Sequence, residues 1–301
     1  MASKPVRKAV IPAAGLGTRL LPATRSLPKE MVVLWDRPLI QYAIEEAVSS
    51  GITCIVLVIN SRKQAIRDYF RPDPQLEVHL RERGKDAEAD LVRRIPELCD
   101  IEFVEQEQPL GLGHAVGCAS SVVGDEPFAV LLPDVVILNE VSCTRQLLEC
   151  HQTRGGCVVA AREVDPQDVQ RFGMMKLKPG SREAPPVLGV ADFVEKPQLY
   201  HAPSLFGIFG RYVLAPEIFD AIARTQPDAH REIQLTSALA LYAREHSAWG
   251  LLFQGRHFDV GDMAGLLEAG IALGLADTSI RPRLASWLRA AAAGEEAAAN
   301  S

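Results

Sequence analysis

The chain has 301 residues, of which 48% are hydrophobic and 23% charged, and its formal net charge is −6. This length and composition predict a globular protein with a sizeable core and exclude a wholly disordered, collagen-like or disulfide-stapled chain. The acidic balance argues against a nucleic-acid-binding protein, because phosphate backbones bind basic surfaces.

Strand and helix patterns alternate along the first half of the chain. The continuous β-branched run Ile52–Ile59 is typical of a strand covered on both faces. The alternation predicts an α/β fold built on a doubly wound, mostly parallel sheet with helices on both faces. Further apolar runs predict strands at 8–12, 101–104 and 128–132, and helical patterns predict helices at 38–50, 63–70 and 113–122.

The pattern changes at two places. Residues 71–100 are dense in charges of both signs and contain three prolines, which indicates a solvated helical excursion. Beyond about residue 140 the pattern becomes mixed α/β. It predicts strands at 189–195 and 205–212 and helices at 216–224 and 233–246.

The cysteines and the apolar runs predict the compartment. Six cysteines show no C-x-x-C pair and no metal-ligand spacing, so we expect free thiols in a reducing cytoplasm. No apolar stretch reaches the roughly 18 residues that span a bilayer. The apolar run near the N-terminus stops at Pro12, too early for a signal peptide. We therefore expect a cytoplasmic protein with no membrane partner.

A glycine-rich segment, Ala13–Arg19 (A-A-G-L-G-T-R), directly follows the first predicted strand. Its two glycines let backbone N–H groups approach an anion closely. The segment is not a Walker A loop, because no Gly-Lys-Ser/Thr follows. It is not a full dinucleotide fingerprint either, because Leu20 stands where the third glycine belongs, which disfavours a Rossmann oxidoreductase.

Basic residues accompany this segment. Residues 1–37 hold seven Lys and Arg against two acidic residues. Arg19 and Lys29 lie among them, and two cations beside a glycine-rich turn suit a polyphosphate. The alternatives are an ordinary strand–helix turn and a solvated basic segment.

Two aspartates are candidate site residues. Asp134 ends an apolar strand, and ligands of open α/β sheets bind at the carboxyl ends of strands. Asp259 precedes Gly261 by two residues, so the alternative for it is a turn-forming role.

These segments belong to a longer series of motifs that resembles the sugar-1-phosphate nucleotidylyltransferases, and among them the bacterial UTP–glucose-1-phosphate uridylyltransferases. The resemblance covers roughly residues 8–290. The matching blocks are G-L-G-T-R-x-L-P-A-T-x-x-x-P-K-E-M from Gly15, then Gly111–Val116, Leu132–Asp134, Val194–Pro197, Gly210–Leu214, Glu232–Thr236 and Phe258–Gly261.

The resemblance implies a fold and a division of the chain. We expect a Rossmann-like nucleotidyltransferase fold with a smaller mixed α/β sugar-binding part. One domain would span 1–295, with a nucleotide-binding half at 8–140, a sugar-binding half at 141–275 and a C-terminal helix at 276–295. Residues 296–301 are expected to form a frayed tail.

The reaction implied is UTP plus glucose 1-phosphate giving UDP-glucose and pyrophosphate. The sugar phosphate is largely dianionic at neutral pH, so it attacks in line without a general base. Catalysis then consists of positioning and charge neutralisation by Mg²⁺, Lys and Arg. The family also implies a homo-oligomer, a dimer or tetramer.

Residue roles follow from the matching motifs. Gln106 would read the uracil edge, since its amide offers one donor and one acceptor to an imide, and His114 is expected to be structural. Lys196 would neutralise the sugar phosphate and Glu195 bind the sugar hydroxyls. The remaining assignments are Arg19 and Lys29 at the β- and γ-phosphates, Ala14, Gly15, Gly17, Thr18, Glu30 and Gly111 at the nucleotide, Gly173 near the sugar, and Asp134 and Asp259 at the metal.

Two points in this assignment depend on local structure. Adjacent strand residues point to opposite faces, so Glu195 and Lys196 reach one ligand only if the strand ends or bulges there. Leu205 replaces an asparagine usual in the family, which predicts looser sugar discrimination, unless this segment only packs against the core. Glu105, Met263 and the 228–231 segment also depart from the family pattern.

Alternative functions remain at this level. A catalytically weak regulatory paralogue is one, although the retained Lys29, Asp134 and Lys196 favour activity. An enzyme for dTTP or another sugar phosphate is the other, because thymine presents the same imide edge as uracil.

Overall fold

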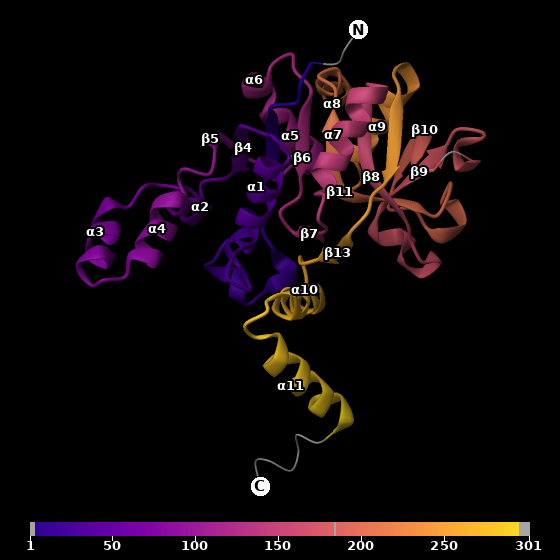
Figure 1. Ribbon diagram of the computed structural model, residues 1–301. Coiled ribbons are helices and arrows are strands. Elements are labelled where there is room, and N and C mark those ends of the chain that lie inside the picture. The colour runs from indigo at the N-terminus through magenta and orange to yellow at the C-terminus, as the bar shows by residue number, and fades with distance from the viewer. Residues whose placement is uncertain (1–3, 184, 295–301) are drawn as a thin grey trace.

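A nine-stranded mixed sheet forms the centre of the computed structural model, which describes residues 4–183 and 185–294 (Figure 1). Its strand order within the described residues is β5-β4-β1-β6-β11-β8-β12-β10-β9. The first four are parallel: β5 (Asp100–Glu105), β4 (Cys54–Ile59), β1 (Lys8–Pro12) and β6 (Phe128–Leu131).

The other five strands are mostly antiparallel. They are β11 (Phe206–Leu214), β8 (Cys157–Glu163), β12 (Ala248–Leu252), β10 (Val187–Glu195) and β9 (Gly173–Leu177). Of their pairings only β8 with β12 is parallel. The α/β fold class is therefore confirmed, while parallel pairing is confined to the first four strands of the sheet and to β8 with β12.

Helices cover both faces of the sheet. Alternating strand residues point to opposite sides: Ile11 packs with Ile40 and Ile44, whereas Val10 packs with Val116. The first face carries α1 (Leu39–Ser49), α2 (Gln64–Tyr69) and α7 (Cys143–Arg154); the other carries α5 (Leu112–Cys118), α6 (Ser120–Val123), α8 (Ile218–Arg224) and α9 (Leu235–Glu245).

Two small strand pairs lie outside the sheet. β2 (Val33–Leu34) pairs with β3 (Arg37–Pro38), and β7 (Val135–Leu138) pairs with β13 (Arg256–Asp259). Because β7 follows β6 after a short turn, β13 brings the end of the chain to the carboxyl edge of the parallel strands.

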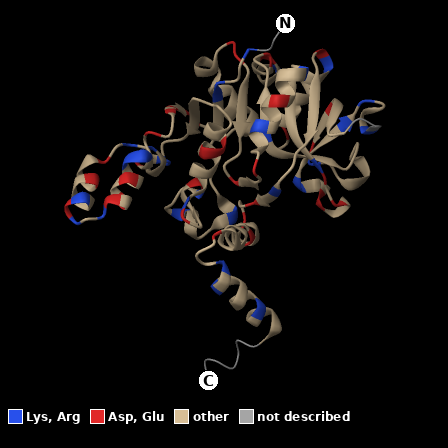
Figure 2. Cartoon of the chain, viewed as in Figure 1, with Lys and Arg blue, Asp and Glu red and all other residues tan. Residues whose placement is uncertain are grey.

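Two helical segments project from the body (Figure 1). The expected excursion at 71–100 contains α3 (Pro74–Glu82) and α4 (Asp86–Arg94), along which both charge signs alternate (Figure 2). Near the C-terminus, α10 (Met263–Ala276) leads into α11 (Arg281–Ala293), none of whose residues is buried by the rest of the described chain.

Most predicted elements agree with these bounds to within a few residues. The helix expected at 113–122 is divided between α5 and α6, and the C-terminal helix expected from 276 begins at Arg281. The tail predicted at 296–301 lies outside the described residues. All six cysteines are free thiols. No helix among the described residues is long and apolar enough to cross a bilayer.

Candidate active site

Two adjoining cavities open at the carboxyl ends of the parallel strands. The first, of about 460 Å³, is lined by the 14–18 loop, Lys29, Gln106 and Gly111. The second, of about 330 Å³, is lined by Arg19, Gly173, Glu195, Lys196 and Asp259. Asp134 lines both cavities, so it lies at their junction.

The glycine-rich loop has the conformation that its sequence suggested. Gly17 has a φ of 68°, in the left-handed region, and a Cβ there would lie 2.9 Å from the Cβ of Lys29. Thr24 Oγ1 donates to the Gly17 carbonyl at 2.7 Å, and Asn60 Nδ2 donates to the Ala14 carbonyl at 2.6 Å. The bond from Asn60, which follows β4, thus holds the loop at the end of that strand, where residues 14–18 line the first cavity.

Lys29 and Arg19 both contact the carboxylate of Asp134. Lys29 Nζ donates to Asp134 Oδ2 at 2.6 Å, and Arg19 Nη2 lies 3.7 Å from the same oxygen. Arg19 Nη1 donates to Asp259 Oδ2 at 3.2 Å, so one guanidinium contacts both candidate metal ligands. A Cβ at position 261 would lie 3.0 Å from Cζ of Arg19 and 3.1 Å from Oδ1 of Asp259, so a larger residue there would require the guanidinium to shift.

Opposed charges keep this cluster ionised. Burial alone would raise the pKa of Asp134, but Lys29 and Arg19 outweigh burial and hold that pKa below its ordinary value. Burial would lower the pKa of Lys29, but Asp134 and Glu30 raise it above its ordinary value. The site therefore presents charged groups at neutral pH.

A buried ion pair supports the turn that carries Asp134. Arg211 donates to the carbonyls of Leu132 and Val135 at 3.0 and 2.8 Å, and to Glu46 Oε2 at 2.8 Å. The Val260 N–H donates to the Asp134 carbonyl at 2.9 Å. These bonds fix the 132–135 turn between β6 and β7.

Two arginines of this site were not identified from the sequence. Arg211 was quoted only as part of a motif. Arg171 contacts Asp259 at 3.3 Å and lines the second cavity. In the sequence, only its position two residues before Gly173 indicates a site residue, and Arg171 was therefore not predicted.

Glu195 and Lys196 both line the second cavity. The strand β10 ends at Glu195, and Lys196 has a φ of 40°, in the left-handed region. Because the strand ends here, Glu195 and Lys196 do not have to point to opposite faces of the sheet, and both can reach one ligand. Gly173 pairs with Glu195, and a Cβ at position 173 would lie 2.8 Å from Thr236 Oγ1.

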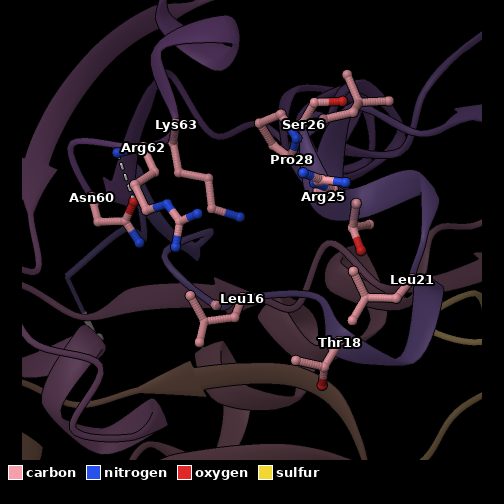
Figure 3. Close-up of a pocket in the computed structure, with 12 residues that line it drawn as sticks. Leu16, Thr18, Leu21, Arg25, Ser26, Pro28, Asn60, Arg62 and Lys63 are labelled. Carbon is pink, nitrogen blue, oxygen red and sulfur yellow. Dashed lines mark hydrogen bonds between the residues drawn. The ribbon is translucent and has the colours of Figure 1, made fainter.

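Glu30 lies apart from the other sequence-predicted site residues, all of which are in the described chain. It lines neither cavity and accepts from Lys63 Nζ at 2.7 Å. Its Oε1 is buried with no partner in the described structure, and burial raises the pKa of Glu30. Lys63 also lines a third cavity, of about 300 Å³. Figure 3 shows this cavity, which Leu16 and Thr18 of the glycine-rich loop line together with Arg62 and Lys63.

Leu205 packs into the core. It packs against the buried apolar cluster that includes Val164 and Val169, and it is not among the residues that line the second cavity. Its carbonyl accepts from the Val164 N–H at 2.9 Å. The position of Leu205 therefore fits the alternative that this segment only packs against the core.

Relatives of the chain are found at high similarity. A family model described as nucleotidyl transferase matches residues 8–274. The chain is 43% identical over 285 residues to UTP--glucose-1-phosphate uridylyltransferase YngB of Bacillus subtilis (strain 168), with 95% of each protein covered. It is 40% identical to UTP--glucose-1-phosphate uridylyltransferase 2 of Staphylococcus saprophyticus, covering 94% of this chain and 97% of that protein.

Solved structures similar to this chain belong to the same kind of protein as these relatives. The UTP-bound UGPase from Acinetobacter baumannii superposes with a TM-score of 0.82 at 36% identity, covering 94% of this chain and 98% of that one. A UDP-glucose pyrophosphorylase complexed with UDP-glucose gives a TM-score of 0.79 at 35% identity, covering 89% and 98%. The resemblance found in the sequence motifs is confirmed, and the chain belongs to the nucleotidyl transferase family.

Proposed function

We propose that this enzyme transfers the uridylyl group from UTP to glucose 1-phosphate, giving UDP-glucose and pyrophosphate. The observation that carries the proposal is the pair of cavities that meet at Asp134, one bounded by the glycine-rich loop and the other by Glu195 and Lys196. Two substrates seated there would bring their phosphates together beside Lys29 and Arg19. Relatives bearing this activity in their names support the assignment.

The first cavity takes UTP. Gln106 and Gly111 contact the base, and the 14–18 loop and Glu30 complete the nucleotide site, Glu30 acting through Lys63 beneath the loop. Arg19 and Lys29 hold the β- and γ-phosphates, where positive charge stabilises the departing pyrophosphate.

The second cavity takes glucose 1-phosphate. Glu195 accepts hydrogen bonds from the sugar hydroxyls, and Gly173 leaves room beside them. Lys196 neutralises the phosphate that attacks the α-phosphorus. No side chain need remove a proton, since the attacking phosphate is already ionised.

The residues at the junction suit Mg²⁺. Asp134 and Asp259 offer two carboxylates, and Mg²⁺ usually takes one or two from a protein before phosphates and water complete its shell. Arg19 contacts both carboxylates, and Asp259 pairs with Val135, the residue after Asp134, which supports a shared site. When bound, the ion would neutralise phosphate charge as a Lewis acid. No cluster of three or more His, Cys, Asp or Glu ligands occurs in the described residues, so the substrate phosphates would have to complete the shell.

A pyrophosphate-release assay tests the function. The enzyme is incubated with Mg²⁺ and UTP, dTTP, CTP, ATP or GTP, each with glucose 1-phosphate and galactose 1-phosphate. We expect the highest kcat/KM with UTP and glucose 1-phosphate. Preference for dTTP would favour the sibling activity, and no release with any pair would favour a regulatory paralogue.

The organisation of the molecule is part of the proposal. The sheet runs without a break from β5 to β9, which supports one domain over 1–295 with halves at 8–140 and 141–275. We also propose a homo-oligomer in the cytoplasm. The free thiols suit a reducing compartment, and an exposed apolar groove between α10, α11 and the β2–β3 hairpin suits a second copy.

A further inference from the structure

The side-chain amide of Gln106 is held in one orientation. Gln106 follows β5 and is buried, with 5% of its surface exposed. Its Nε2 lies 3.2 Å from the Gly111 carbonyl oxygen and 2.9 Å from His114 Nδ1. A carbonyl oxygen can only accept, so the group beside Gly111 must be the NH₂ and not the oxygen.

Both hydrogens of the amide are therefore used inside the protein. One goes to the Gly111 carbonyl and the other to Nδ1 of His114, which must be unprotonated to accept it. His114 then carries its proton on Nε2, which lies 4.0 Å from Cys118 Sγ. The sequence had suggested that Gln106 offers a ligand both a donor and an acceptor; in the structure its donors are occupied.

Only the amide oxygen remains for a ligand. Gln106 Oε1 has no hydrogen-bond partner among the described residues. It is also not fully buried, because the one fully buried side-chain atom without a partner in the described structure is Glu30 Oε1. Gln106 Oε1 is therefore open to the first cavity, which Gln106 lines. An acceptor at this position favours a base with an N–H on its pairing edge.

We propose that His114 is a specificity-determining residue, which keeps Gln106 Oε1 directed at the nucleobase and thereby selects uracil over cytosine. Uracil carries an N–H at ring position 3, whereas cytosine has a lone pair there that would face the Gln106 oxygen. Acceptor facing acceptor leaves both groups desolvated and unpaired, which is how a polar site rejects a close analogue. The inference rests on the proposed role of Gln106 in reading the base.

His114 acts here by positioning and does not need to touch the nucleotide, since it lines neither cavity. Without its acceptor, the amide of Gln106 can rotate and present NH₂ to the N3 of cytosine. The Gly111 carbonyl still opposes that rotation, so selectivity is reduced and not abolished.

A matched pair of variants tests the proposal. His114→Leu removes the acceptor and has a size similar to histidine, whereas His114→Asn is smaller but places Oδ1 where the histidine has Nδ1. We measure kcat/KM for CTP and for UTP with glucose 1-phosphate. The Leu variant should raise the CTP/UTP ratio about fivefold, the equivalent of one neutral hydrogen bond, and the Asn variant should stay near wild type.

The control is Cys118→Ala, which alters the other neighbour of His114 and should leave the ratio unchanged. A purely structural role for His114 would lower both kcat/KM values together and leave their ratio alone. That result in His114→Leu, with thermal melting showing a folded protein, would overturn the inference.

Gln106→Ala separates the inference from its premise. If this variant changes the CTP/UTP ratio while His114→Leu does not, Gln106 reads the base but His114 does not orient it. If Gln106→Ala leaves the ratio unchanged, the role proposed for Gln106 is wrong and the inference about His114 is wrong with it.

Discussion

The carboxylate of Asp134 lies between two cations, with Lys29 at 2.6 Å and Arg19 at 3.7 Å. We expect Asp134→Asn, which keeps the shape and removes the charge, to lower kcat about a hundredfold or more. It should also weaken binding of Mn²⁺, used as a spectroscopic substitute for Mg²⁺. Asp259→Asn should have a smaller effect if Asp259 only supports the site. Asp125→Asn, at an exposed position, is the control. Normal Mg²⁺-dependent turnover in Asp134→Asn would contradict the assignment.

Lys196 and Glu195 are expected to affect different kinetic constants. Lys196 faces charge shared by both substrates, which is greatest near the transition state, whereas Glu195 faces neutral hydroxyls that change little during reaction. Interactions that strengthen in the transition state raise kcat, and uniform ones mainly alter KM. Steady-state kinetics should therefore show a lowered kcat for Lys196→Gln and a raised KM for glucose 1-phosphate for Glu195→Gln. The reverse pattern would reject this division.

At the scale of residues, the sequence identified those that stand in compact motifs. Thirteen residues assigned to the site line at least one of the two cavities, because the motifs end at the carboxyl edge of the sheet. Glu30 is the exception, since nothing in the local sequence indicates that Lys63 binds its carboxylate beneath the loop. Arg171 was missed for the same reason: its contact with Asp259 joins residues far apart in the chain.

Among the elements, the 132–135 turn depends on a buried ion pair between α1 and β11. Glu46 accepts from Arg211 and also from the backbone N–H and hydroxyl of Thr144. Removing one partner leaves the other charge buried and unpaired. We expect Glu46→Ala to lower the free energy of unfolding by about 3–5 kcal/mol.

A double-mutant cycle checks this prediction by urea denaturation. Arg211→Met combined with Glu46→Ala should destabilise the protein by less than the sum of the single changes, because the pair is removed together. Mn²⁺ affinity should fall in parallel, since the same turn carries Asp134. The exposed pair Arg224–Glu245 is the control, and its removal should change stability little. Additive effects at Glu46 and Arg211 would show that they do not act as a unit.

The elements most easily predicted are those decided by local pattern. The strand β4 is covered on both faces, so its β-branched run identifies it without knowledge of its neighbours. The short strands β7 and β13 pair across more than a hundred residues. The apolar run V-V-I-L of β7 is typical of a strand, but β13 (R-H-F-D) has no strand pattern, so the sequence does not indicate their pairing. The direction of β11, which reverses the sheet, likewise depends on long-range pairing.

At the scale of the whole molecule, an apolar surface lies where α10 and α11 project from the body (Figure 1). The groove between α10, α11 and the β2–β3 hairpin has a volume of about 1020 Å³. Its lining includes Trp35, Met263, Leu267 and Trp287, whose exposed fractions lie between 41% and 66%. Exposed apolar patches of this kind mark interaction surfaces.

A second copy of the chain is the proposed occupant of that groove. The helix α11 projects from the body and also lines the groove. Two copies related by a two-fold axis can therefore each cover the other's apolar residues. We expect the wild-type protein to have at least twice the chain mass in light scattering coupled to gel filtration. Leu267→Glu places a charge in the contact and should give a monomer. Leu91→Glu on α4 is the matched control, because Leu91 is 63% exposed and Leu267 66% exposed, and only Leu267 lies in the groove. A monomeric wild type, or a Leu267→Glu variant with the wild-type mass, would show that this surface does not join copies of the chain.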